Sequence, residues 1–348
     1  MKSLSAIAKE MGVSVATVSY VYNDKWRENR IHPDLAEQDR RKIAEERGAA
    51  DILGRQLQSG RTMTVGLLLP HLEQPYFLYL LAGIERRLGD SDYMVLLGIA
   101  HEGHEDRQVG IAERMLARRV DAMLVCPRPT SGLGEFVSSL QKSGRRPIVF
   151  LDNYLSGTST PHVSSDNRWG ARRAVETLLA GGRRRILFLG GNSAVAALQD
   201  RHAGYCDALK DAGLKRDQSL VIWRDSGDAS ALEAVRSLLR SEAPPDAIFA
   251  TSYYRLFPFL ELLDELGLHH PQNVRLAGFD EAMETWAAEV VRNVIQEPLL
   301  VVHQAAAEIG RVAVDLALSA VNGVDVSEQK RLIRPILSWQ QNDKNPEI

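Results

Sequence analysis

The sequence predicts an α/β protein in which a small all-α head precedes a larger domain built on parallel β-sheet. After Thr64, short apolar, β-rich runs alternate with segments of helical period, the pattern of repeated βαβ units. Before residue 62 there are short helical segments, no strand-like run, and dense charge from Arg40 to Arg47. A chain of 348 residues is long enough for both parts.

Composition excludes several classes of protein. Hydrophobic residues make up 45% and charged residues 25%, which argues against a disordered chain. No apolar run approaches the roughly 20 residues that span a bilayer, and the start lacks a secretory signal, so we expect a cytoplasmic, nucleoid-associated protein with no membrane partner. The two cysteines, Cys126 and Cys206, are far apart, which favours buried side chains in a reducing compartment over a zinc ribbon or a redox pair.

The head begins with two short helices joined by a glycine. Apolar residues from Leu4 to Met11 fall on one helical face, and Gly12 is expected to end that helix in a tight turn. Ser14 is a good N-cap for a second helix, in which Val18 and Val21 face inward. Such a pair of helices predicts a helix-turn-helix.

The outward face of the second helix carries the residues expected to contact DNA. Hydroxyl groups suit phosphates and small apolar side chains suit thymine methyl groups. Any two short helices joined by glycine would also produce this pattern, with no DNA-binding role. The residues on this face are Ser14, Val15, Ala16, Thr17, Ser19 and Tyr20.

The larger domain reads as alternating strands and helices. Strands are expected at 64–70, 93–99, 121–126, 147–151, 185–190, 219–223, 246–250, 273–279 and 292–296, with a last one at 331–339. Helices are expected near 76–90, 104–117, 133–143, 167–181, 198–212, 228–240 and 253–267, with a long one over 299–321.

The head and the segment after it resemble the LacI/GalR family of transcriptional regulators. The resemblance rests on Ile7-Ala8, Gly12-Val13-Ser14, Thr17-Val18-Ser19 and Asn23, on a third helix from Pro33 to Gly48, and on Arg61-Thr62 leading into Val65-Gly66-Leu67 and Pro70. It implies a homodimer that binds double-stranded operator DNA, with Asn23, Arg55 and Leu57 added to the DNA-binding residues. Leu57 would wedge between base steps from a hinge helix.

The resemblance also implies the domain boundaries and a sensor similar to periplasmic binding proteins, with two doubly wound parallel-sheet subdomains. The DNA-binding domain would cover 1–50 and the hinge 51–62. The effector-binding domain would cover 63–340, with one subdomain at 63–162 and 292–323, the other at 163–291 and 324–340, and a tail at 341–348.

A small-molecule effector, a sugar or sugar derivative, is expected in the cleft between the subdomains, at the carboxyl ends of strands. Asp152, Arg201, Asp280 and Gln296 match positions that contact ligand in the family, although each aspartate could equally cap a helix or pair locally. His71, Tyr76 and Phe77 would form an apolar or stacking wall, with core packing equally open for Phe77. Ser252 and Tyr253 complete the predicted set.

Three departures from the family pattern bear on specificity. Tyr20 stands where the family commonly has arginine, so a bidentate contact to guanine is unavailable there. The connection 24–30 is longer than usual, and Trp26, Arg27 and Arg30 in it could contact backbone phosphate or simply pack, with packing expected for Trp26. Ser252-Tyr253 replaces the usual Asn-Asp, which leaves open a larger effector or none.

No motif indicates an enzyme, a cofactor or a metal. Gly190-Gly191-Asn192 lacks the rest of a nucleotide-binding signature, and the segment 101–105 lacks metalloprotease spacing. The sequence therefore predicts an effector-controlled transcriptional repressor. The alternatives are a solute-binding protein of the same sensor fold and a regulator with no small-molecule effector.

Overall fold

The computed structural model describes residues 3–22, 25–43, 60–101, 104–129, 132–143, 146–224, 228–280 and 299–340. The chain divides into two compact units, Met1–Met63 and Thr64–Ile348. Most of the predicted hinge (51–59) and the predicted tail (341–348) lie outside the described residues. In the described part, no helix is long and apolar enough to cross a membrane.

The first unit contains helix α1 (Leu4–Met11), helix α2 (Val15–Tyr22) and a helical segment at 33–43. The Ser3 side chain caps α1 by accepting from the Ala6 N–H. Gly12 ends α1 with a left-handed φ of 65°, and both its N–H and that of Val13 donate to the Ala8 carbonyl. A residue with a Cβ is strained in this conformation, which is why the turn favours glycine.

The head folds around its own small apolar core. The two helices and the 33–43 segment contribute fully buried side chains, and the connection after α2 adds partly buried ones. The predicted inward positions on both helices are confirmed. The buried members are Ile7, Ala8, Val18, Val21, Ala36 and Ile43, and Trp26 and Ile31 pack against them.

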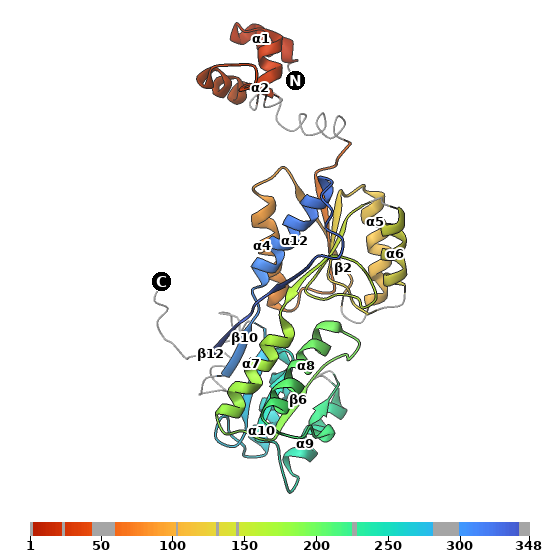
Figure 1. Ribbon diagram of the computed structural model, residues 1–348, viewed down its shortest axis with the longest axis vertical. Helices are drawn as coiled ribbons and strands as arrows, with labels where there is room; N and C mark the ends of the chain where they lie inside the picture. Colours follow the sequence, from red (N-terminus) through yellow and green to blue (C-terminus); the bar gives the residue numbers. More distant parts are fainter. Residues whose placement is uncertain are drawn as a thin grey trace. The chain divides into compact units, whose positions relative to one another are not determined.

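The second unit contains two six-stranded sheets, each covered by helices on both faces (Figure 1). The first sheet has the order β11-β5-β4-β3-β1-β2 and is parallel throughout. Helices α4 (Pro75–Leu88) and α12 (Ala306–Val321) lie on one face, and α5 (Gln108–Ala117) and α6 (Leu133–Ser143) on the other. Its strands are β1 (Thr64–Leu69), β2 (Met94–Ile99), β3 (Ala122–Val125), β4 (Ile148–Leu151), β5 (His162–Ser165) and β11 (Lys330–Ile333).

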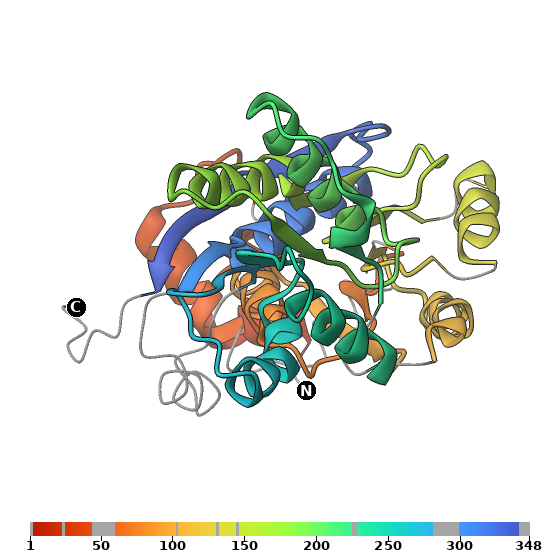
Figure 2. The same cartoon turned by 90° about the horizontal axis from the view of Figure 1, so that it is seen from below.

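The second sheet has the order β12-β10-β9-β8-β6-β7, and only β12 runs antiparallel to its neighbour. Figure 2 shows the green helices α7 (Asn167–Ala180) and α8 (Ala196–Asp211) on one side, and the teal and cyan helices α9 (Ala229–Leu239) and α10 (Phe257–Glu265) on the other. Its strands are β6 (Ile186–Leu189), β7 (Val221–Ile222), β8 (Ala247–Ala250), β9 (Arg275–Phe279), β10 (Leu299–His303) and β12 (Ile336–Gln340).

Glycine allows the helices of each layer to cross closely. A Cβ on Gly83 of α4 would lie 2.0 Å from the Ala307 carbonyl oxygen, and one on Gly310 of α12 would lie 2.4 Å from the Leu80 carbonyl oxygen. In the other subdomain, a Cβ on Gly204 of α8 would lie 2.1 Å from the Arg168 carbonyl oxygen. Both helix pairs therefore depend on backbone contact that no larger residue permits.

The predicted α/β architecture is confirmed, but the part from residue 299 onward needs correction. Residues 299–303 form β10 of the second sheet, whereas the sequence predicted the start of a long helix there. The apolar run Leu299–His303 continues into the apolar face of α12, so periodicity alone did not separate strand from helix.

The predicted final strand 331–339 is two strands in different sheets. β11 joins the first sheet and β12 the second, with Arg334 and Pro335 between them. Proline has no N–H to donate to a ladder, which is consistent with a break at this point.

These two changes move the subdomain boundaries. Residues 299–303 were predicted in the first subdomain but belong to the second sheet. Residues 330–333 were predicted in the second subdomain but belong to the first sheet, and all of β5 at 162–165 belongs to the first sheet too. The chain therefore passes between the subdomains at 166, 304–305 and 334–335. The predicted strand at 292–296 lies outside the described residues.

Candidate functional site

Helix α2 presents an exposed face next to a well-capped N-terminus. The Ser14 Oγ accepts from the Thr17 N–H at 3.0 Å and lies 2.8 Å from the Thr17 Oγ1. This bond satisfies one of the N–H groups that a helix start leaves without a partner. Val15 is 49% exposed and Tyr20 is 39% exposed, although both are large apolar or aromatic side chains. The helix start is therefore capped, and this face is accessible.

The predicted DNA-binding residues divide into two groups. Ser14, Val15, Ala16 and Tyr20 are exposed, and Thr17 and Ser19 are partly exposed, all on α2 or at its cap. The remaining three, Asn23, Arg55 and Leu57, lie outside the described residues.

In the second unit, two aspartates end strands of different sheets with the same unusual backbone. Asp152 follows β4 with φ 66°, and Asp280 follows β9 with φ 85°. Residues other than glycine adopt this region at a cost and concentrate at functional sites when they do, with aspartate among the more tolerant. Both carboxylates lie at carboxyl ends of parallel strands, where open α/β sheets bind ligands.

Arg201 of α8 lies close to Asp280 and within electrostatic reach of Asp152. Its side chain is 5% exposed, and its Nη1 lies 3.9 Å from the Asp280 Oδ1. The Nε donates to the Asn167 Oδ1 at 2.7 Å, Nη1 donates to the Thr251 carbonyl, and the guanidinium stacks over the Phe279 ring at 3.9 Å. Burial lowers the pKa of Arg201, while Asp280 and Asp152 oppose that change by favouring the charged form.

The charges of the cluster perturb one another. Burial raises the pKa of Asp152, while Arg201 and Arg128 counteract this shift. The Cys126 Sγ lies 3.4 Å from the Asp152 Oδ2, and burial followed by this carboxylate raises the pKa of the thiol. Burial, again with Asp152 adding to it, raises the pKa of Tyr76. Perturbed groups from both subdomains thus share one environment, which is typical of a binding site.

The segment just after β4 bridges the subdomains. The Asn153 Nδ2 donates to the Pro127 carbonyl at 2.7 Å, and the Asn153 Oδ1 accepts from the Ala197 N–H of α8 at 3.1 Å. The next residue, Tyr154, donates its hydroxyl proton to the Asp200 Oδ2 at 3.0 Å. The described conformation is therefore held by polar contacts between the two subdomains.

Several buried polar atoms near these strand ends have no hydrogen-bond partner within the described part of the chain. They include the Thr251 Oγ1 and Ser252 Oγ after β8, and the Gln304 Oε1 after β10. The Gln304 amide nitrogen donates to the Asp280 Oδ1. A buried polar atom without a partner is costly in a folded protein. Unused hydrogen-bonding capacity beside paired charges is what a polar ligand requires.

Aromatic side chains flank the polar cluster. Phe77 is 2% exposed and packs edge-on against His71 at 4.8 Å and Tyr76 at 5.3 Å. His71 in turn lies 3.0 Å from Glu73. Phe77 and Tyr76 both belong to the apolar core of the first subdomain, so Phe77 contributes through packing.

On the opposite side of the cluster, Tyr253 is 2% exposed, whereas the next residue, Tyr254, is half-buried. Burial, followed by the Asp280 charge, raises the pKa of Tyr254 to about 12. Tyr254, and not the predicted Tyr253, is thus the accessible phenol near this carboxylate.

Of the predicted effector set, the structure brings together Asp152, Arg201, Asp280 and Tyr76. Ser252 lies nearby, just after the end of β8. Gln296 lies outside the described residues. Sequence reasoning missed Gln304 because the strand before it was taken for a helix. It also missed Asn153, Asn167, Arg128 and Tyr254. The signal that could have identified Asn153 and Asn167 is a polar side chain one or two residues beyond a buried strand.

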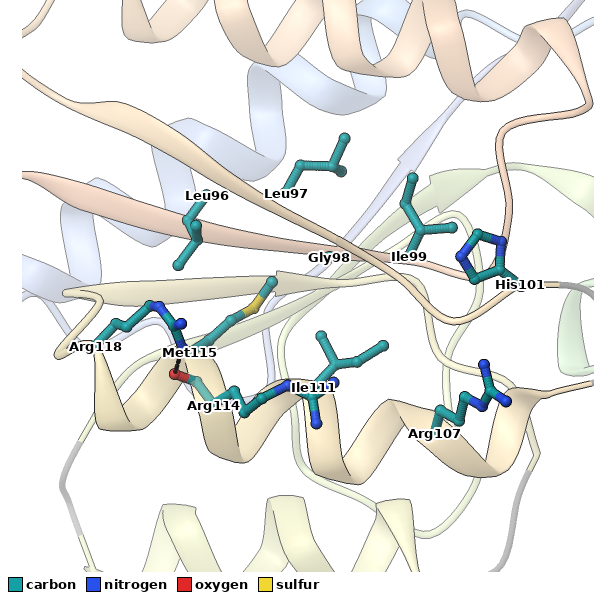
Figure 3. Close-up of a pocket in the computed structure, with 10 residues that line it drawn as sticks. All are labelled: Leu96, Leu97, Gly98, Ile99, His101, Arg107, Ile111, Arg114, Met115 and Arg118. Atoms are coloured by element: carbon teal, nitrogen blue, oxygen red, sulfur yellow. Dashed lines mark hydrogen bonds between the residues drawn. The ribbon is translucent and has the colours of Figure 1, made fainter.

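A groove of about 420 Å³ lies elsewhere, between edge strand β2 and helix α5 (Figure 3). Ile111 and Met115 point from α5 toward the strand, and Gly98 lets the helix approach, since a Cβ there would lie 2.5 Å from Ile111. Met94, on the same strand, is 74% exposed. Exposed apolar side chains on an unpaired edge strand favour association with another chain.

Comparison with known proteins gives consistent matches over nearly the whole chain. Residues 62–339 match the family model described as periplasmic binding proteins and sugar binding domain of LacI family. The chain is 23% identical over 335 residues to the ribose operon repressor of Haemophilus influenzae, covering 96% of each. It is 27% identical over 341 residues to the HTH-type transcriptional repressor PurR of Erwinia tasmaniensis, covering 97% of this chain and 95% of the relative.

Among solved structures, the lac repressor dimer bound to operator and the anti-inducer ONPF shares the fold with a TM-score of 0.73 at 19% identity. The match covers 97% of both chains.

Proposed function

The chain belongs to the LacI/GalR family of transcriptional regulators and is not an enzyme. From this premise we propose that it is a repressor whose affinity for operator DNA is controlled by a small molecule. The observation that carries the DNA-binding part is the exposed, Ser14-capped face of α2. A helix of this kind enters the major groove with its N-terminal half against base edges.

The proposed base-reading residues are Val15, Ala16 and Tyr20. Val15 and Ala16 suit thymine methyl groups, and the Tyr20 hydroxyl can donate or accept a single hydrogen bond. Ser14 and Thr17 are proposed to contact phosphate, because each hydroxyl can still donate or accept beyond the bond between them. By resemblance to the family, Leu57 is proposed as the minor-groove wedge.

The proposed effector is a polar molecule with several hydroxyl groups, such as a sugar or a sugar derivative. Its support is the cluster of Asp152, Arg201 and Asp280 together with the unpartnered Ser252 and Gln304 oxygens. Carboxylates accept from ligand hydroxyls, and the guanidinium donates to ring or hydroxyl oxygens. Arg201 is already held by Asn167 and Thr251, so its donors are oriented before a ligand arrives.

Control of DNA binding is proposed to follow from the position of the cleft. A ligand that contacts Asp152 on one subdomain and Arg201 on the other changes the balance between closed and open arrangements of the two. Because binding free energies are linked, a ligand that favours the arrangement with weak DNA affinity relieves repression.

We propose a homodimer that acts in the cytoplasm on the nucleoid. The groove between β2 and α5, with Met94 exposed beside it, is the proposed contact surface in the sensor (Figure 3). A two-fold dimer predicts a near-palindromic operator.

The effector proposal is tested by screening the full-length protein against sugars, sugar acids and nucleosides by thermal shift, then measuring operator binding with each hit. We expect at least one hit that raises the melting temperature and changes operator affinity. Arg201→Lys should retain operator binding and weaken the response to the hit, because a lysine cannot form the guanidinium fork. A library without hits would favour a regulator that has no small-molecule effector.

A further inference from the structure

The connection that follows α2 forms a compact turn with backbone hydrogen bonds at both of its ends. The Lys25 N–H donates to the carbonyl of Tyr20, in the last turn of α2, at 2.8 Å. This bond ties the start of the turn to the helix. The Ile31 N–H donates to the Trp26 carbonyl at 2.9 Å, and Asn29 donates both its N–H and its side-chain Nδ2 to the Lys25 carbonyl. Trp26 and Ile31 pack against the head core. The backbone of the turn is thus held by hydrogen bonds and by two apolar anchors.

The same turn exposes an excess of positive charge. Lys25, Arg27 and Arg30 are exposed, as is Glu28, and the sequence has one further carboxylate in this connection, Asp24, so three cations stand against two carboxylates. In the described part of the chain, no ion pair or side-chain hydrogen bond engages these three cations. By contrast, surface arginines of the sensor such as Arg168 and Arg172 pair with carboxylates at 2.6 to 2.8 Å.

Trp26 orders the arginine side of this turn. The Arg27 guanidinium lies 5.0 Å from the Trp26 ring centroid, and that of Arg40 lies 5.6 Å from it. A cation over the face of an indole ring is attracted by the negative potential of that face. Arg27 is therefore partly oriented in the free protein, which reduces the conformational entropy that it loses on binding.

We propose that this turn is a second DNA-binding element, in which Arg27 and Arg30 contact phosphates of the operator backbone next to the base pairs read by α2. The inference rests on the proposed function, because α2 must enter the major groove for the turn to reach a phosphate. Arginine is suited to this role, since its planar fork matches phosphate geometry. The contact supplies affinity without sequence information, while α2 supplies the specificity.

The proposal accounts for two departures of this chain together. Tyr20 cannot form the bidentate pair with guanine that an arginine would, so one strong base contact is missing. The longer connection adds Lys25, Arg27 and Arg30 directly after the same helix. Displacing counterions from the DNA favours binding for each phosphate that a cation neutralises.

The test measures the salt dependence of binding by the full-length protein. Fluorescence anisotropy is recorded from about 50 to 200 mM salt on a duplex that the protein itself selects from a random pool, and on a scrambled duplex. Arg27→Ala and Arg30→Ala are compared with wild type. Arg240→Ala is the matched control, because it removes an equally exposed arginine from the end of α9 in the sensor.

We expect each head variant to reduce the slope of log K against log salt by about 1.8, because each of the two protomers on the operator loses one phosphate contact worth about 0.9, with little change in which sequence is preferred. Arg27→Lys should keep the wild-type slope because it keeps the charge, whereas a purely structural role for Arg27 would not be rescued in this way. Circular dichroism melting checks that the head remains folded.

The inference would be overturned if Arg27→Ala and Arg30→Ala gave the same salt slope as Arg240→Ala on a duplex that wild type binds specifically. That result would leave the proposed function intact. Wild type that binds both duplexes equally would overturn the proposed function, and the inference with it.

Discussion

The side-chain oxygen of Asn153, in one subdomain of the sensor, accepts a hydrogen bond from the backbone N–H of Ala197, in the first turn of α8 in the other subdomain, at 3.1 Å. Val195, the N-cap of α8, has no side chain that could cap the helix, so the Ala197 N–H is satisfied by a residue of the other subdomain. A helix start in one subdomain is thus completed by a residue of the other. The arrangement of the two subdomains is thereby coupled to the hydrogen bonding of α8, which also carries Arg201.

Replacing Asn153 tests this coupling. Asn153→Ala leaves the Ala197 N–H and the Pro127 carbonyl without their partner, and we expect the free energy of unfolding to fall by about 1 to 3 kcal/mol. Hydrogen exchange should be faster at the first turn of α8. Ser139→Ala, which removes only a local bond to the Phe136 carbonyl, serves as the control. Unchanged protection of the Ala197 amide in Asn153→Ala would refute the coupling.

Two glycines in helices, Gly310 at the crossing of α4 and α12 and Gly110 in α5, should respond to alanine with opposite changes in the free energy of unfolding. Gly310→Ala places a methyl group 2.4 Å from the Leu80 carbonyl oxygen, so we expect destabilisation by about 1 to 3 kcal/mol. At Gly110, in α5, the nearest atom to a new Cβ is the end of the flexible Arg114 side chain, at 3.6 Å. Gly110→Ala should therefore stabilise the protein by up to about 1 kcal/mol through helix propensity. Chemical denaturation measures both, and equal effects would contradict the close-contact argument.

The sequence predicted most of the fold because its local signals agree with one another. Gly12 and Ser14 each mark a helix boundary by the chemistry of a cap, and the buried strands are short apolar runs between helical segments. The errors lie where the local sequence pattern fits more than one kind of element. Leu299–His303 is apolar throughout and runs into an apolar helix, and the break at Pro335 separates strands that join different sheets. Sheet membership is a long-range property that local patterning does not specify.

The candidate site was predictable only in part, for a similar reason. Asp152 and Asp280 could be identified because a polar residue directly after a buried strand lies at the edge where ligands bind. Gln304 plays the same role after β10 and was missed with that strand. The contacts of Asn153 with Ala197 and of Tyr154 with Asp200 connect residues more than forty positions apart, and no spacing in the sequence signals such pairs.

His162 predicts a pH dependence of stability. Its side chain is buried at the start of β5, stacked on Tyr154 at 4.7 Å and paired in register with Lys330. Burial, with Lys330 adding to it, lowers the pKa of His162 to about 4, whereas an unfolded histidine titrates near 6.5. The unfolded state therefore binds the proton more tightly, and stability present above about pH 6.5 is lost as the pH falls toward 4.

The measurement is the free energy of unfolding between pH 7 and 4 for wild type and His162→Gln. Since His202 and His303 also have lowered pKa values, the informative quantity is the difference between the two proteins. We expect the wild type to lose stability more steeply, by up to about 1.4 kcal/mol per pH unit for one proton. Parallel curves would show that His162 is not buried in its neutral form.

The groove at β2 predicts the oligomeric state. Met94→Glu places a charge on the exposed edge strand, where a partner subunit would bury it without compensation, so we expect the dimer to dissociate. Leu332→Glu makes the same change on the opposite edge strand, β11, where Leu332 is 56% exposed. Sedimentation velocity should give twice the 38.6 kDa chain mass for wild type and for Leu332→Glu, and the single-chain mass for Met94→Glu. A Met94→Glu variant that remains dimeric would place the interface elsewhere.

The most direct test of the account is selection of duplex DNA from a random pool by wild type and by Tyr20→Arg, followed by sequencing. We expect wild type to enrich one near-palindromic sequence. We expect the variant to change one symmetric pair of positions to guanine, because an arginine fork on the exposed face of α2 pairs with the guanine O6 and N7. No enriched sequence for wild type, or the same sequence for both proteins, would contradict base reading by α2.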